Sequence, residues 1–171
     1  MLYHSRTVGD KYKCLSGLVF GQSLQHLLFG IFVECRCGFI ENHDAQVFNP
    51  EVQAFNVIDA DGTYLGMIYT DFFPRASKRS GAWMTGFRDQ YIDDKGSDVR
   101  PLVSITMNFT KPTGSKPSLL TFDEVETFLH EFGHALHSLF RDVHYYGISG
   151  VPRDFVELPS QINEHWVFEP E

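Results

Sequence analysis

Two histidines and a glutamate occupy one short stretch of the chain, at a spacing that suits chemistry at a metal ion. His130 and His134 are four positions apart, so on a helix their side chains project about 40° apart and about 6 Å apart along the axis. Two imidazoles placed in this way can bind one zinc ion, and each keeps its second ring nitrogen free for an orienting partner. Glu131 projects about 100° further round the helix, beside the metal face. Its carboxylate is therefore placed to act on a water molecule.

These residues form the HExxH motif, in which the two histidines bind zinc and the glutamate is the general base and not a ligand. Such a short pattern also arises by chance, but here it lies among apolar residues. Unpaired ionisable groups in such surroundings would cost several kcal/mol unless a metal or another partner satisfied them. His137 lies about 10.5 Å along the axis from His130, so we interpret it as a wall of the site or a residue that orients a ligand.

A catalytic zinc site needs a third protein ligand and keeps one open position for water. Glu157 is flanked by Val156 and Leu158, and this apolar setting predicts a buried carboxylate. We therefore expect Glu157 to be the third ligand. Asp154 is expected to cap the following helix or to support the site, and Glu164 is expected on a solvent-exposed helix face.

The helix that carries the motif has a clear start signal. Thr121 and Glu124 form a T-x-x-E capping box, with Leu120 and Val125 placed to form a hydrophobic staple across it. Apolar residues then recur at helical spacing to about Phe140. Their number predicts a helix that is largely enclosed by protein.

Strand signals precede this helix. Residues 52–57 alternate, residues 59–62 have turn chemistry and residues 64–69 are rich in β-formers, so these three segments predict a hairpin. Further strands are expected at residues 81–84 and 102–109. The fold class that follows is α+β.

Composition limits the class of protein. The chain has 171 residues, 43% hydrophobic and 21% charged, which is typical of one soluble domain with a hydrophobic core. Its formal net charge of −8 and its lack of a basic run argue against nucleic acid as a partner. Polar residues interrupt the apolar stretch 18–33, so no membrane span is expected. Three cysteines without CxxC spacing fit reduced thiols, and we expect a cytoplasmic monomer.

Two segments together resemble a known family. The sequences FLHEFGHALH at 128–137 and DFVELPSQ at 154–161 resemble the thimet oligopeptidase and dipeptidyl carboxypeptidase family of zinc metallopeptidases. The resemblance extends back to about Glu41. Residues 78–84 and 161–166 are most similar to the bacterial-type dipeptidyl carboxypeptidase branch. Residues 41–171 are thus identified as a partial zinc-metallopeptidase catalytic domain, and residues 1–40 stay an unassigned apolar, helical segment.

The resemblance implies a zincin-like core, with a small antiparallel sheet beside the HExxH helix and a second helix that carries the third ligand. It implies one zinc ion on the two histidines and Glu157, with Glu131 activating water for attack on a peptide carbonyl. It also implies that extended substrate pairs with the strand that contains Gly81, Ala82 and Trp83. A loop containing Gly147 and Gly150 would close over the substrate, although a plain turn fits these glycines equally well.

Three interpretations of function follow. The first is a zinc metallopeptidase that hydrolyses short oligopeptides, as an oligopeptidase or a peptidyl-dipeptidase. The second is a catalytically inactive zinc-binding fragment of such an enzyme, because members of the family are several times longer than this chain. The third is a metal-free α+β interaction domain with a coincidental motif.

Overall fold

The computed structural model describes residues 39–42 and 47–168, so most of the predicted segment 1–40 lies outside the described residues. Within the described part, the elements in chain order are β1 (Phe39–Asn42), β2 (Gln53–Ile58), β3 (Tyr64–Asp71), β4 (Trp83–Arg88), β5 (Tyr91–Ile92), β6 (Asp98–Val99), β7 (Leu102–Thr106), α3 (Phe122–Leu139), α4 (Leu158–Glu164) and the short 3-10 helix η2 (His165–Val167). One five-stranded sheet has the order β1-β2-β3-β7-β4, and β5 pairs with β6 separately. The α+β class is confirmed.

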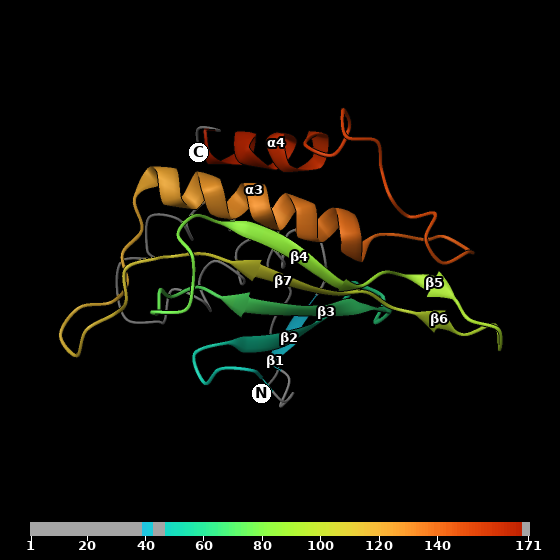
Figure 1. Cartoon of the computed structure of the whole chain (residues 1–171), viewed down its shortest axis with the longest axis horizontal. Coiled ribbons are helices and arrows are strands. Elements are labelled where there is room, and N and C mark those ends of the chain that lie inside the picture. The colour runs from blue at the N-terminus through green and yellow to red at the C-terminus, as the bar shows by residue number, and fades with distance from the viewer. Residues whose placement is uncertain (1–38, 43–46, 169–171) are drawn as a thin grey trace.

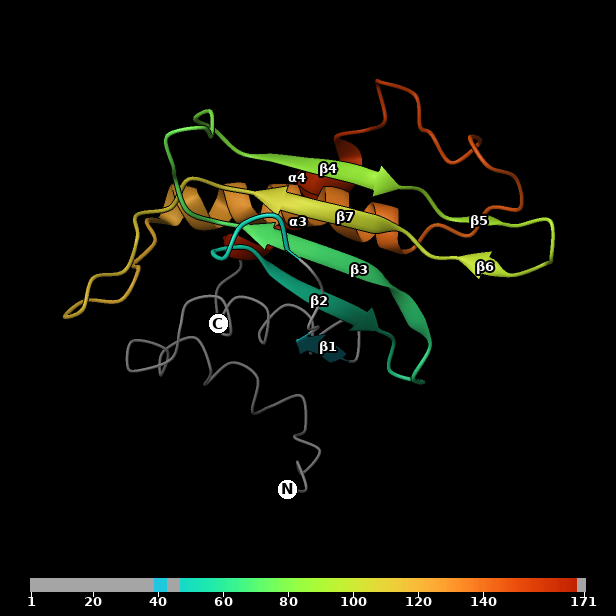
Figure 2. The same cartoon turned by 60° about the horizontal axis from the view of Figure 1, so that its bottom comes forward.

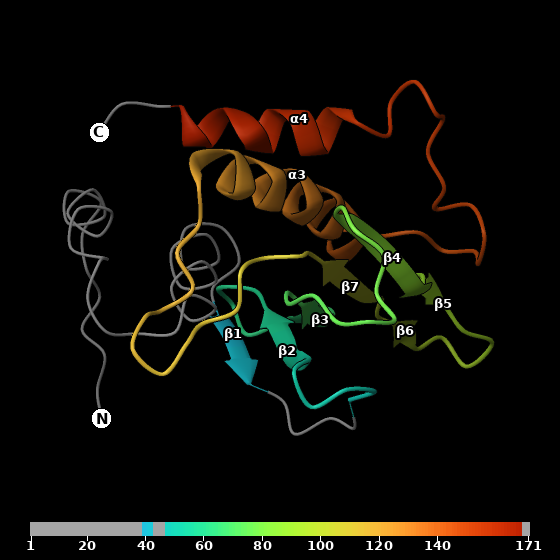
Figure 3. The same cartoon turned by 60° about the vertical axis from the view of Figure 1, so that its left-hand side comes forward.

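The described elements form three layers, which are the large sheet, α3 and α4. Helix α3 lies across one face of the large sheet, and α4 lies along α3 on its far side from the sheet (Figures 1 and 3). Among the described residues, no helix is long and apolar enough to cross a membrane.

The large sheet is mixed, so the prediction of an antiparallel sheet is wrong. Strand β7 lies between β3 and β4, and it pairs parallel with β3 and antiparallel with β4 (Figure 2). The chain leaves β3, forms β4 and the β5-β6 hairpin, and only then returns as β7. Parallel neighbours need such a long connection. Alternation within a single strand carries no information about which strand becomes its neighbour.

The predicted hairpin is confirmed. Strands β2 and β3 pair antiparallel, and the turn between them is closed by hydrogen bonds from the amides of Asp59 and Gly62. Gly62 has φ +89, a left-handed conformation that glycine adopts without strain. The strand predicted at 102–109 forms as β7 but ends earlier, at Thr106. The strand predicted at 81–84 starts later, at Trp83, and continues to Arg88.

The predicted motif helix is also confirmed, and its capping box is formed. The Glu124 amide donates to Thr121 Oγ1, and the Thr121 amide donates to the Glu124 carboxylate at 2.8 Å. At the other end, the Arg100 guanidinium donates to the carbonyls of Leu139, at 2.6 Å, and Arg141. These side chain contacts satisfy backbone groups that a helix end leaves open, and they fix the end of α3 to the start of β7.

The hydrophobic core lies between the sheet and α3. Phe128 and Phe132 stack with centroids 5.7 Å apart, and Phe128 meets Phe72 edge-on. All three rings are buried. Because these aromatic side chains fix which face of α3 meets the sheet, they also fix the direction in which the polar residues of the motif project.

Candidate metal centre

The structure brings the three predicted ligands together. One ligand atom each from His130, His134 and Glu157 lie within 4.8 Å of one another. Glu157 Oε2 is 3.2 Å from Nε2 of both histidines. The two imidazole rings are nearly perpendicular, with centroids 4.9 Å apart, so both present Nε2 to the same point.

This donor set fits a zinc ion. Two atoms bound to zinc at 2.0–2.1 Å with a tetrahedral angle between them lie about 3.3 Å apart, close to the 3.2 Å between the Glu157 carboxylate and each imidazole. Burial lowers the pKa of His134, which favours the neutral imidazole that binds metals. Two nitrogens and one carboxylate oxygen are also the ligand types of hydrolytic zinc sites.

The predicted setting of Glu157 is wrong in two respects. Its side chain is 50% exposed and not buried, and the residue does not lie within a helix but immediately before α4, at the N-cap position. The flanking residues misled the prediction because this part of the chain is a turn, in which neighbouring side chains diverge. Leu158, the first residue of α4, is likewise 46% exposed. The apolar neighbours therefore say little about where the carboxylate lies.

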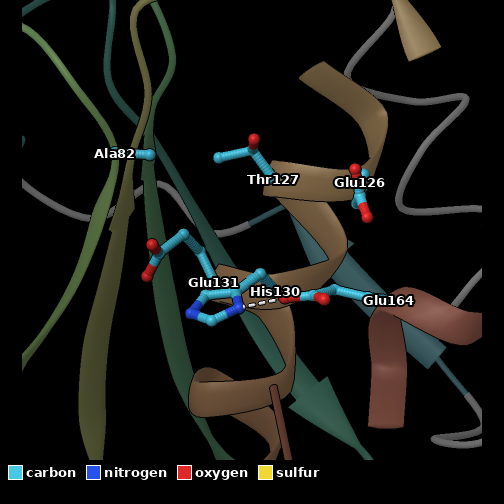
Figure 4. A pocket seen from close by; sticks show the side chains of 6 residues that line it. All are labelled: Ala82, Glu126, Thr127, His130, Glu131 and Glu164. Atoms are coloured by element: carbon cyan, nitrogen blue, oxygen red, sulfur yellow. Dashed lines mark hydrogen bonds and ion pairs between the residues drawn. The ribbon is translucent and has the colours of Figure 1, made fainter. Parts of the chain in front are cut away.

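A carboxylate that the sequence placed on an exposed face instead contacts a ligand. His130 Nδ1 donates to Glu164 Oε1 (Figure 4), and the Glu164 side chain is only 26% exposed. The contact fixes the proton on Nδ1 and leaves the Nε2 lone pair directed toward the other ligands. One signal was available: Glu164 follows Glu157 by seven residues, about two helical turns, which places both on one side of α4.

Glu131 lies beside the three ligands, on the side of the sheet. Its side chain points from α3 toward the strands, across an open pocket of about 410 Å³ that Ala82 also lines (Figure 4). Burial raises the pKa of the Glu131 carboxyl, while the His130 imidazole and a backbone hydrogen bond from Met84 oppose this. A carboxylate with a raised pKa accepts a proton more readily, as a general base must.

Comparison with known proteins identifies the family. The model of Peptidase family M3 matches residues 13–171. The chain belongs to Peptidase family M3. Over 145 residues it is 44% identical to dipeptidyl carboxypeptidase from Salmonella typhimurium, covering 84% of this chain and 20% of that protein. It is 43% identical over 134 residues to oligopeptidase A from Escherichia coli, covering 77% of this chain and 20% of that protein. It is 45% identical over 132 residues to a thimet-like oligopeptidase from Dictyostelium discoideum, covering 75% of this chain and 20% of that protein.

The M3 chain therefore spans about a fifth of the length of the curated relatives that it matches. The match to the family model begins at residue 13, whereas the resemblance inferred from the motifs reached back only to about Glu41. Membership of a metallopeptidase family excludes the interpretation that the HExxH motif is coincidental.

The structure places the two supporting residues predicted for this M3 site at its margin. The half-buried His137 ring meets the Phe155 ring with centroids 6.3 Å apart, and burial lowers the pKa of His137. Within the described part of the chain, His137 makes no hydrogen bond to a predicted ligand. Asp154 is exposed, and its predicted role as a helix cap is wrong because α4 has Glu157 as its N-cap.

Of the three residues of the strand segment predicted to contact substrate, only Ala82 lines the pocket beside Glu131. The Trp83 ring lies under the Arg79 guanidinium and lines another pocket with Thr106 of the sheet. Gly81 is exposed, and its carbonyl accepts a hydrogen bond from Asn108 Nδ2 at 2.7 Å.

The loop after α3 does not enter this pocket. Gly147 and Gly150 are exposed and are absent from the pocket lining. The loop is tied instead to the β5 end of the molecule, where the Ile92 amide donates to the His144 carbonyl and the Val143 amide donates to Gln90. Closure of this loop over a substrate therefore stays a prediction.

Proposed function

We propose that this chain forms the zinc-binding part of an M3 oligopeptidase or peptidyl-dipeptidase active site that hydrolyses short peptides. His130, His134 and Glu157 would hold one zinc ion. The observation that carries the proposal is the meeting of these three side chains from two segments, with Glu131 beside them and an open pocket in front. The proposal includes a cytoplasmic, monomeric protein with short peptides as its partners.

The chemistry divides between the metal and the protein. A zinc ion held by His130, His134 and Glu157 would supply Lewis-acid chemistry, which lowers the pKa of a water molecule to about 7 and polarises a peptide carbonyl. Glu131 accepts the proton of the attacking water at its carboxylate and then donates it to the nitrogen of the departing amine. Glu164 holds the His130 ring in the orientation that directs Nε2 into the site.

Strand β4 is proposed to bind the main chain of the substrate. It is the end strand of the described sheet, and Met84 makes a backbone hydrogen bond to Glu131. Alternate residues of a strand direct their backbone groups to the same edge. We therefore expect the N–H and C=O of Ala82, which directly precedes β4, to face the free edge together with those of Met84. An extended peptide can add to this edge by β-augmentation.

Substrates modified in the backbone test this pairing better than a proline at Gly81. Gly81 has φ +99, whereas proline fixes φ near −65°, so that variant would distort the strand itself. A peptide N-methylated at the amide that pairs with β4 should show a raised KM. Its isomer, methylated at a terminal residue outside the pairing region, is the control. Equal KM values for the two peptides would contradict the pairing.

The central experiment measures cleavage of a short internally quenched peptide by the chain with bound zinc. We expect cleavage that a chelator abolishes and added zinc restores. Glu131→Gln should lower kcat by about 10²- to 10⁴-fold, the usual contribution of a general base, while zinc content stays at the wild-type level. Loss of zinc from this variant would contradict the assignment of Glu131 as a base outside the ligand set.

A second candidate is zinc binding without catalysis, and the short matched length favours it. The chain covers about 20% of its curated relatives, so residues of those proteins outside the matched part can contribute to their catalysis. Bound zinc with no peptide cleavage in the same experiment would support this candidate. Absence of zinc binding would contradict both.

A further inference from the structure

Helices α3 and α4 touch backbone to backbone at Gly133. A Cβ atom at this position would lie 2.6 Å from Ser160 Cα and 2.7 Å from the Pro159 carbonyl oxygen. Both neighbours are main-chain atoms, so they cannot move aside without moving α4 itself. The close approach of the two helices thus depends on the missing side chain at Gly133.

This contact lies within the candidate metal centre. Gly133 stands between the two histidines of the motif, and Ser160 is three residues after Glu157. The fully buried Ser160 hydroxyl lies 2.9 Å from the Glu157 carbonyl oxygen and 3.0 Å from Glu157 Oε2. The turn that presses on Gly133 therefore also holds the carboxylate that faces the imidazoles.

The other end of α4 is anchored independently. Asn163 Nδ2 donates to the Leu129 carbonyl oxygen at 2.6 Å, and Glu164 accepts from His130. A side chain added at Gly133 would therefore push mainly on the first turn of α4, because the last turn is tied to α3. Glu157 is at the end that would move.

The size of the required movement can be compared with what a metal site tolerates. A 2.6 Å contact must open by about 0.8 Å to reach 3.4 Å, where ordinary van der Waals contact begins. Metal–ligand distances vary by about 0.2 Å around their usual values. The displacement is several times larger than this tolerance.

We infer that Gly133 is a positioning residue, which lets α4 approach closely enough for Glu157 to share a zinc ion with the two histidines, and that Ser160 then orients the Glu157 carboxylate. The inference rests on the proposed zinc site. It adds that the affinity for the metal is set partly by a residue that contributes no ligand atom.

The test is the zinc affinity of the full 171-residue chain, measured by competition with a chromophoric chelator. We expect Gly133→Ala to weaken zinc binding tenfold or more. Gly114→Ala is the control, because a Cβ at Gly114 would meet no atom within 4 Å and its backbone is not left-handed. Alanine is the better helix former, so helix propensity alone predicts no loss at Gly133.

A double-mutant cycle separates positioning from general stability. If Gly133 acts through Glu157, adding Gly133→Ala to Glu157→Ala should cause little further loss of zinc affinity. Ser160→Ala gives a second probe without a steric clash, and it should weaken binding only while Glu157 is present. If Gly133→Ala fails to fold, Ser160→Ala still tests whether the first turn of α4 acts on zinc affinity through Glu157.

The outcomes are distinct. Wild-type zinc affinity in Gly133→Ala, or a lower unfolding midpoint of the metal-free chain with zinc affinity unchanged, would overturn the role of Gly133. Equal losses from Ser160→Ala with and without Glu157 would overturn the role of Ser160. If Glu157→Ala itself binds zinc as tightly as the wild type, the ligand set of the proposed function fails instead.

Discussion

The hydrogen bond between His130 and Glu164 gives a quantitative prediction for the metal site. Glu164→Gln keeps the size of the side chain and a neutral acceptor oxygen, but it removes the negative charge that holds the proton on His130 Nδ1. The imidazole then becomes a weaker and less firmly oriented ligand. We therefore expect zinc affinity to fall while the fold is preserved.

The expected loss lies at the low end of the usual range. Removing a partner that orients a metal ligand costs about 10- to 100-fold in affinity. Here both side chains are 26% exposed, so water screens the interaction in part and replaces some of what is lost. Because the glutamine oxygen can still accept a hydrogen bond from His130, we expect zinc affinity to fall about tenfold, which corresponds to about 1.4 kcal/mol.

Competition with a chelator measures this loss, and Glu126→Gln is a matched control. Glu126 lies one helical turn before His130 and lines the same pocket. In the described part of the chain it makes no hydrogen bond to a ligand. The control therefore removes the same charge at a similar place and should change zinc affinity little.

Equal losses in the two variants would refute the reasoning, because the effect would then come from the field of nearby carboxylates and not from orientation of the ring. No loss in either variant would also refute it. A thermal scan of the metal-free proteins completes the comparison, since a misfolded Glu164→Gln chain would lower zinc affinity for another reason.

Two further predictions concern the elements that hold the site. Thr121→Ala removes the side chain oxygen that accepts from the Glu124 amide, and it should lower the free energy of unfolding in urea by about 1 kcal/mol; an unchanged midpoint would contradict the role of the capping box. At Asp71, burial raises the carboxyl pKa, but hydrogen bonds from Arg75 and Lys78 outweigh it, and the net pKa is lowered. The pKa of Asp71 in the folded chain therefore lies below its pKa in the unfolded chain, which is about 3.9. The ionised Asp71 carboxylate stabilises the fold above that pH, and this stabilisation is lost as the pH falls through the lower pKa of the folded chain. The difference in unfolding free energy between wild type and Asp71→Asn should therefore be large at neutral pH and shrink below about pH 3.9, and a constant difference would contradict this.

Local signals account for the parts of the fold that could be predicted. The capping box joins Thr121 to a residue three positions away, and the hairpin turn at 59–62 joins neighbouring strands. Both depend on contacts within a few residues, where spacing alone fixes the geometry. The pairing of β7 with β3 and β4 depends on contacts across tens of residues, and no such rule applies to it.

In the metal site, too, the features set by local spacing could be predicted, and those set by packing between helices could not. The four-residue spacing of His130 and His134 places two imidazoles together on any helix. Glu157 could be named from the second motif, but its exposure could not, because it depends on the turn that precedes α4. The role of Glu164 was missed because a charged residue on a short helix is usually solvent-exposed, and only the packing of α4 on α3 shows its partner.

Helix packing and metal binding are therefore linked in this protein. Glu157 lies immediately before the first turn of α4, which rests on Gly133, and the last turn of α4 contributes the partner of His130. Because both ends of one short helix act on the same ligand set, a substitution that tilts α4 must disturb at least one of them. Residues that pack α4 on α3 without touching a ligand, such as the buried Asn163 that donates to the Leu129 carbonyl, should then alter zinc affinity as well as stability. If such substitutions lowered stability but left zinc affinity unchanged, the ligands would have to adjust freely around the ion. That result would contradict the preorganised site that these contacts describe.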